Sequence, residues 1–100
     1  MQSVHFSMAA LKDLVEIDAY STEEWGEAQA DRYLSQLKEC CFRLAKNPLL
    51  GRNCQTIRPG LRRIEGKHVI FCRKIEDDIW VSRILHQGMK PERHPMSDEP

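Results

Sequence analysis

The side chains that can bind anions or transfer protons are concentrated in the second half of the sequence. Residues 51–74 contain seven lysines or arginines and one acidic residue, Glu65, although the formal net charge of the whole chain is zero. Such a local excess of cations attracts phosphates or acidic partners even when the total charge is balanced. A solvated sheet face with charged turns explains the same pattern, and both interpretations fit the sequence.

His86 and the arginines before it provide part of what phosphodiester cleavage needs. Cleavage of RNA through its own 2′-hydroxyl requires a base for that proton, cations that hold the phosphate, and an acid for the leaving oxygen. Imidazole titrates close to neutral pH, so His86 suits proton transfer. However, Arg83 is three positions away, and on a regular strand the two side chains face opposite sides unless a bulge intervenes. The sequence therefore favours a binding surface, and we assign no catalytic residue.

Other kinds of chemical site have little support. His86 and His94 lack a third ligand with metal-site spacing, and we expect neither a metal nor a cofactor. The cysteines show no CxxC spacing, so buried or free thiols are expected at Cys40, Cys41, Cys54 and Cys72. Ser21 and Glu24 have the spacing of a capping box, which explains these polar residues by the start of a helix rather than by catalysis.

Residues 59–86 are expected to form three short strands joined by tight turns. β-branched and aromatic residues are dense between the turn-forming residues, which are Gly66 and the acidic triplet at 76–78. The expected strands are residues 61–65, 68–75 and 79–86. A three-stranded meander buries one face, so another part of the chain must cover it.

Two helices are expected to provide that cover. Ser7 is a suitable N-cap for a helix over residues 8–20, and Ser21 for a second helix over 22–46 that includes Gly26 in its first turn. Asn47 and Pro48 end the second helix, since the residue before proline avoids the helical region. The expected buried positions are Ala10, Leu14 and Ile17, widened by Leu11 and Val15, and then Ala30, Tyr33, Leu34, Leu37, Cys41 and Leu44, with Trp25 opening that side.

The remaining segments complete an α+β fold in one domain over residues 1–95, of order β-α-α-β-β-β. Residues 4–6 alternate as a short edge strand would, residues 49–58 read as a loop, and a proline-rich tail follows residue 86. We expect residues 96–100 to be disordered. No signal peptide or membrane-length apolar stretch is present, which predicts a cytoplasmic protein that does not enter a membrane.

Short segments spread over residues 4–95 carry a resemblance to a known family. In the helices these are ALKDLVEI at residues 10–17, WGEAQA at 25–30 and LAKNP at 44–48. In the strands and turns they are GR at 51–52, PGLRR at 59–63, HVIF at 68–71 and RILH at 83–86, followed by Met89 and His94. In this order and spacing the chain resembles ParE toxins of the RelE/ParE superfamily, the toxin half of bacterial type II toxin–antitoxin pairs. Cys72 departs from the family, which usually has tyrosine there.

The resemblance implies a helix hairpin packed on a small, mainly antiparallel sheet. It also implies a ParD-like antitoxin with a ribbon–helix–helix DNA-binding part, DNA gyrase as the inhibited target, and contact with DNA only through the antitoxin. The residues that it points to for target binding are Arg62, Arg63, Arg83, His86, Met89, Arg93 and His94.

Two alternatives to a gyrase inhibitor remain. RelE-type relatives are ribosome-dependent mRNA endonucleases that use several basic residues and a terminal tyrosine or histidine. This chain has no tyrosine after Tyr33, so an inhibitor is favoured over an enzyme. An inactive chain that only binds the antitoxin is the other alternative.

Overall fold

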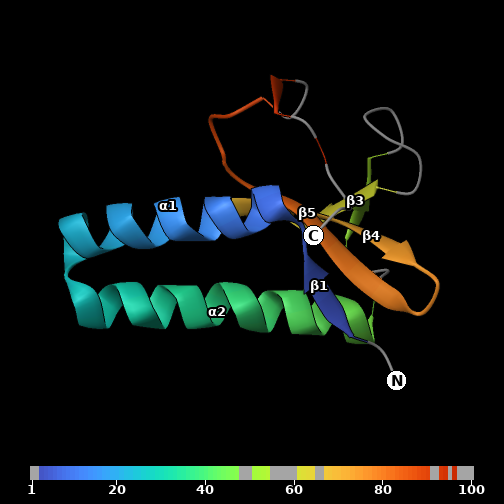
Figure 1. The fold of residues 1–100 in the computed structure, drawn as a ribbon, viewed down its shortest axis with the longest axis horizontal. Helices are drawn as coiled ribbons and strands as arrows, with labels where there is room; N and C mark the ends of the chain where they lie inside the picture. The colour runs from blue at the N-terminus through green and yellow to red at the C-terminus, as the bar shows by residue number, and fades with distance from the viewer. Residues whose placement is uncertain are drawn as a thin grey trace.

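The protein folds as two long helices that pack on a five-stranded sheet (Figure 1). A computed structural model describes residues 3–47, 51–54, 61–64, 67–90, 93–94 and 96. The elements are β1 (Val4–Phe6), α1 (Met8–Trp25), α2 (Glu27–Lys46), β2 (Arg52–Asn53), β3 (Leu61–Ile64), β4 (His68–Ile75) and β5 (Asp78–His86). The predicted α+β class and the helix hairpin are confirmed.

The sheet has the order β1-β5-β4-β3-β2, with β5 and β4 at its centre. β3, β4 and β5 form the predicted antiparallel meander, and β4 has the predicted bounds. The predicted N-terminal edge strand is confirmed, because β1 pairs in parallel with β5. Cys72 is paired with Val81 and Phe71 with Arg83, so Ser82 is an extra residue that forms a β-bulge in β5.

β2 was not predicted from the sequence, which gave residues 49–58 as a loop. Arg52 and Asn53 pair with Arg63 and Arg62 and add a two-residue edge strand. Gly51, just before β2, has the Cβ of Arg62 and the carbonyl oxygen of Arg63 3.2 Å from where its own Cβ would lie. A larger residue there would push β2 away from β3. The rest of the predicted loop, residues 49–50 and 55–58, lies outside the described residues.

The boundary between the helices is the main correction to the sequence analysis. Ser21 does not cap a second helix: α1 continues to Trp25, and the Ser21 side chain is buried with no hydrogen-bond partner among the described residues. The break occurs at Gly26, whose φ of 88° is a conformation that residues with a Cβ rarely adopt. The backbone N–H of Gly26 donates to Thr22 and closes α1, while its carbonyl accepts from Ala30 and opens α2. Backbone conformation therefore overrides the capping-box pattern.

The N-terminus of α1 is fixed as the sequence predicted. The Ser7 Oγ accepts a hydrogen bond from the backbone N–H of Ala10 at 3.0 Å and donates one to the carbonyl of Ser82 at 2.8 Å. The same hydroxyl therefore caps the helix and joins it to the bulge of β5.

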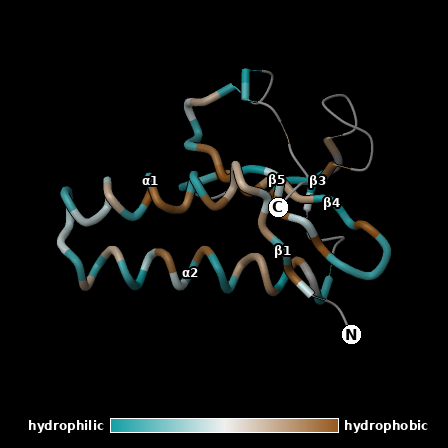
Figure 2. The backbone as a smooth tube through the Cα atoms, viewed as in Figure 1, coloured by the Kyte–Doolittle hydropathy of each residue, from teal (hydrophilic) through white to brown (hydrophobic). Residues whose placement is uncertain are grey.

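The core lies between the hairpin and one face of the sheet. Figure 2 shows hydrophobic and hydrophilic stretches alternating along both helices, as expected for helices with one buried face. The predicted seams of α1 and α2 lie in this core, where they meet Ile70, Cys72, Ile79, Val81 and Ile84 of the sheet. Leu11 and Val15, predicted to widen the buried stripe, are instead exposed by 45% and 69%.

A second, smaller core lies on the opposite face of the sheet. Leu61, Phe71 and Leu85 are almost fully buried there together with Cys54, and Met96 packs against them. Part of the C-terminal segment therefore returns to the sheet. Residues 97–100 of the predicted disordered tail lie outside the described residues.

Candidate functional site

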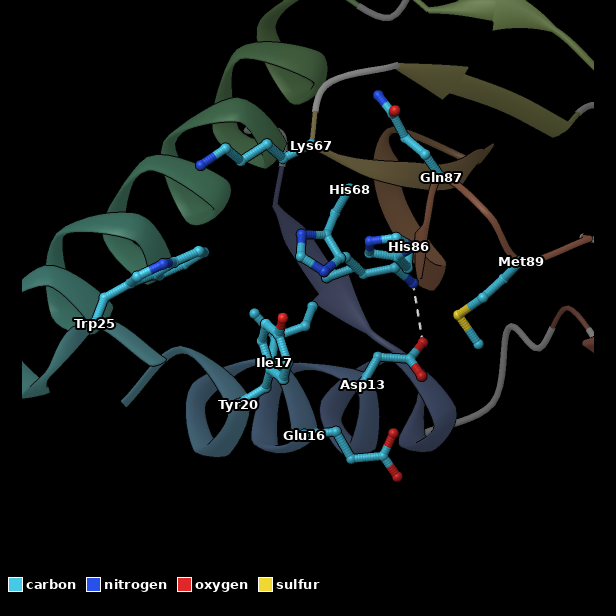
Figure 3. Close-up of a pocket in the computed structure, with 11 residues that line it drawn as sticks. Asp13, Glu16, Ile17, Tyr20, Trp25, Lys67, His68, His86, Gln87 and Met89 are labelled. Atoms are coloured by element: carbon cyan, nitrogen blue, oxygen red, sulfur yellow. Dashed lines mark hydrogen bonds between the residues drawn. The ribbon is translucent and has the colours of Figure 1, made fainter. Parts of the chain in front are cut away.

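A cavity of about 610 Å³ opens between α1 and the adjoining ends of β4 and β5 (Figure 3). Its volume is within the range of roughly 300–1,000 Å³ that is usual for ligand sites. The apolar lining consists of Ile17, Tyr20, Trp25, Ile84 and Met89. The polar lining consists of Asp13, Glu16, Lys67, His68, His86 and Gln87. Helix, sheet and the turn after β5 thus each contribute a wall.

Asp13 and Arg83 form an ion pair that joins α1 to β5 beside the cavity. The carboxylate accepts from the Arg83 Nε at 2.8 Å and from its Nη2 at 2.9 Å. It also accepts from the backbone N–H of Ile84 at 2.9 Å, the dashed line in Figure 3. The hydrogen bonds to Asp13 raise the pKa of Arg83. This pairing uses the charge of Arg83 for structure.

His68 and His86 face each other across the antiparallel β4–β5 pair at the sheet wall of the cavity. They occupy paired register positions, and their ring centroids are 5.8 Å apart in an edge-to-face arrangement. The Nδ1 of His68 is hydrogen-bonded to the Tyr33 hydroxyl of α2 at 2.5 Å. The Nδ1 of His86 accepts from the backbone N–H of Gly88 at 3.2 Å. Both rings are therefore held from outside the cavity.

Burial controls the charge of the Tyr33–His68 pair. Burial lowers the pKa of His68, and the nearby His86 lowers it further. Burial also raises the pKa of Tyr33. Both shifts favour the neutral forms of the two groups.

A continuous row of rings runs from the tip of the helix hairpin to the end of β5. Tyr20 meets Trp25 at 6.3 Å between centroids, Trp25 meets Tyr33 at 6.1 Å, and Tyr33 meets His68 at 5.5 Å. The Lys67 ammonium lies 4.8 Å from the centroid of Trp25, within cation–π range. Three of the large exposed apolar side chains, Tyr20, Trp25 and Met89, border the cavity with exposed fractions of 60%, 43% and 39%.

The structure brings together only some of the residues predicted for target binding. His86 and Met89 line the cavity, with Arg83 behind it in the ion pair. Arg83 reaches Asp13 of α1 while His86 lines the cavity, contrary to the opposite sides expected for these two positions of a regular strand. The bulge at Ser82 lies directly before Arg83, and the pairing from Arg83 to His86 is regular.

The other predicted contact residues lie away from the cavity. Arg62 and Arg63 are on β3, and the Nη1 of Arg62 donates to the Gly51 carbonyl at 2.8 Å, which is a structural role. Arg93 and His94 follow the turn after β5 and do not line the cavity.

Sequence reasoning missed Trp25, Lys67 and His68 as members of this site. Trp25 was expected to open the second helix, but it ends the first and so reaches the cavity. The alternation of β4 could have identified His68, because it places His68 on the same face as the core residue Ile70.

Neither the thiols nor the other ionisable groups of the described chain form a metal site. Within the described ranges, no three histidine, cysteine, aspartate or glutamate side chains are close enough to hold an ion. The four cysteines, all within the described ranges, form no disulfide with one another. Burial raises the pKa of Cys41 to about 12 and that of Cys72 to about 11, which keeps both thiols protonated.

A profile of the family described as "ParE toxin of type II toxin-antitoxin system, parDE" matches residues 4–91. The chain belongs to the ParE toxin family. Toxin ParE1 of Mycobacterium tuberculosis is 42% identical over 90 residues, which is 88% of this chain and 92% of the relative. Toxin ParE1 of Caulobacter vibrioides is 34% identical over 95 residues, or 94% and 98% of the two chains.

A solved structure supports the fold of this ParE family member. A chain of the "Chromosomal ParDE TA system from P. aeruginosa" superposes with a TM-score of 0.73, covering 86% of this chain and 96% of that chain. The two are 20% identical, so the likeness concerns the fold. Among the described residues, no helix is both long and apolar enough to span a membrane.

Proposed function

We propose that this ParE family toxin stops growth by binding DNA gyrase and blocking its cycle, without catalysing a reaction itself. The family membership carries the proposal, since ParE toxins characteristically act on gyrase. Gyrase works on the chromosome, so the toxin acts in the cytoplasm. A ParD-like antitoxin with a DNA-binding part neutralises it, and the toxin contacts operator DNA only through that partner.

The cavity between α1 and β5 is the surface that we assign to the target. It contains His86 and Met89, two residues that the sequence already pointed to, and it has exposed aromatic rings at its edge. Large, rigid aromatic side chains that stand partly exposed beside a pocket are typical centres of protein recognition. Arg93 and His94 follow in the chain and extend the proposed contact beyond the cavity.

The RelE-type nuclease is the weaker alternative. Arg83, the cation nearest to His86 in the sequence, is held by both oxygens of Asp13 and is 14% exposed. A cation that is already paired with a carboxylate contributes little to stabilising the negative charge that develops on a phosphate during RNA cleavage.

A supercoiling assay tests the proposed target. Purified toxin is added to gyrase, relaxed plasmid and ATP, and both supercoiled and linear DNA are measured on gels. We expect supercoiling to decrease and gyrase-linked breaks to accumulate, and purified antitoxin to reverse both effects. Unchanged supercoiling and no breaks at a large excess of toxin would exclude gyrase as the target.

Trp25→Ala tests the assigned surface in the same assay. Loss of one central aromatic anchor costs about 2 kcal/mol or more in a typical interface, so inhibition should weaken by about thirtyfold. Phe42→Ala is the matched control, because Phe42 is 57% exposed on α2 and does not line the cavity. Equal inhibition by the two variants would show that the target surface lies elsewhere on the toxin.

A further inference from the structure

The hydrogen bond of His86 defines which of its ring nitrogens carries the proton. The Nδ1 of His86 accepts from the Gly88 N–H, while the Nδ1 of His68 is hydrogen-bonded to the Tyr33 hydroxyl. A neutral imidazole with an accepting Nδ1 has its hydrogen on Nε2. His86 is therefore the Nε2–H tautomer, and its remaining polar atom is a hydrogen-bond donor.

The His86 donor lies in one wall of the cavity together with His68 and the Lys67 cation. His68 and His86 lie side by side in the close-up, with Lys67 on the same side and Trp25 beyond it (Figure 3). Lys67 carries three more N–H donors on a flexible stem, and its ammonium already lies over the Trp25 ring. The wall thus offers several donors and a positive charge, the chemistry that binds a carboxylate.

The acidic residues of the opposite wall do not cancel this preference. Asp13 is occupied by three hydrogen bonds from Arg83 and Ile84 and is neutralised by the Arg83 charge. Figure 3 shows the Glu16 carboxylate directed away from the two imidazoles. Between the two walls lie Ile17, Tyr20 and Met89, which suit an apolar group.

We propose that this cavity binds a carboxylate-bearing segment of the toxin's target protein: an acidic side chain held by His68, His86 and Lys67, with the neighbouring apolar side chain packed against Trp25, Tyr20 and Met89. The proposal rests on the proposed function only in taking the occupant from the target. The observations that carry it are the Nε2–H donor of His86 with His68 beside it, the adjacent Lys67 ammonium and the exposed apolar rim.

A titration of the toxin alone with a capped dipeptide tests the carboxylate. Acetyl-Glu-Phe-amide is added to ¹⁵N-labelled toxin, and the imidazole and Trp25 indole N–H signals are followed by NMR. Acetyl-Gln-Phe-amide is the neutral counterpart. Charged hydrogen bonds exceed neutral ones enough for the glutamate form to bind about tenfold more tightly. Equal affinities, or shifts only at residues outside the cavity, would overturn the proposal.

Matched variants distinguish the loss of a hydrogen-bond donor from a general effect of substitution on the fold. His86→Phe keeps an aromatic ring but removes the Nε2–H, and it should reduce the preference for glutamate over glutamine severalfold. His5→Phe is its control, since His5 stacks on Trp80 away from the cavity. Lys67→Gln should act like His86→Phe, with Lys74→Gln as its control. An undiminished preference in both cavity variants would contradict the assigned donors.

A competition experiment tests whether the segment that occupies the cavity comes from gyrase or from the antitoxin. Excess purified gyrase should displace acetyl-Glu-Phe-amide from the toxin. Displacement of the dipeptide by the antitoxin but not by gyrase would overturn the assignment to the target. Saturation of the cavity by free phenylacetate, with no binding of the dipeptide, would overturn it as well. The titration contains no gyrase, so a failed supercoiling assay and a failed titration are separate results.

Discussion

At the scale of single residues, Asp13 is the most consequential side chain of the helix layer. It is 6% exposed and connects α1 to two successive residues of β5. A buried ion pair contributes modest net stability, but removal of one partner leaves the other charge buried without compensation. Nothing local in the sequence identifies this role of Asp13, because its partner Arg83 is 70 positions away.

Asp13→Asn tests this role. We expect the variant to lose about 3 kcal/mol of unfolding free energy, because the Arg83 guanidinium then lacks its counter-charge. Urea denaturation at neutral pH measures the loss. Asp78→Asn is the control, since its pair with His5 is more than one-third exposed and solvent screens it, so a much smaller loss is expected. Similar losses in the two variants would show that burial does not govern these pairs.

The burial of His68 predicts a dependence of stability on pH. The folded protein lowers the pKa of His68 below its ordinary value of 6.5, chiefly by burial, with His86 and Lys67 adding to the effect and Asp13 opposing it. The unfolded chain then binds the proton more readily. The contribution is therefore complete above pH 6.5 and is lost as the pH falls through the lower pKa of the folded state.

His68→Gln isolates that contribution. Urea denaturation of wild type and variant is compared from pH 7.5 to pH 5. The difference in unfolding free energy between them should shrink as the pH falls, because only the wild type loses stability by protonation of His68. A constant difference across the range would show that His68 does not titrate with folding.

At the scale of elements, the hairpin depends on Gly26. Its φ of 88° and ψ of 164° belong to a region that is almost restricted to glycine. Nothing lies within 4 Å of the position that a Cβ would take. Any cost of substitution is therefore a cost of backbone conformation and not of a clash.

Gly26→Ala should lower the unfolding free energy by about 2 kcal/mol. A semisynthetic protein with D-alanine at position 26 should retain the stability of the wild type, because the D-residue favours positive φ. Thermal denaturation of the two proteins checks this prediction. Equal destabilisation by both alanine forms would point to a steric cause.

The elements also show how far sequence reasoning reaches. Periodicity identified both helices, β4 and the core positions, because burial of one face imposes a period of 3.6 or 2 on the residues themselves. It misplaced the helix junction, since Ser21 and Glu24 match a cap but Gly26 has the required backbone freedom. It missed β2, because a two-residue strand leaves no periodic pattern. The cavity could not be predicted from the sequence, because its walls come from distant segments that meet only through tertiary packing.

At the scale of the whole molecule, the thiols report on global opening. Cys41, Cys54 and Cys72 are at most 5% exposed, whereas Cys40 is partly accessible. We expect iodoacetamide at pH 8 to modify Cys40 first and the other three only at the rate of unfolding. Peptide mass spectrometry over time measures the order. Modification of Cys41 as fast as Cys40 in folded protein would show that α2 detaches locally.

The parallel pairing of β1 with β5 has a consequence for folding during translation. Ser7 anchors the start of α1 to Ser82, 75 positions later, and Val4–Phe6 must wait for Ile79–Val81 before they can pair. At about 5–20 residues per second, translation takes roughly 4–15 s to cover that stretch. During this interval the nascent chain has a hairpin but lacks β5, which pairs with both β1 and β4. The cavity is complete only when Met89 has also been translated, so it cannot form before β5.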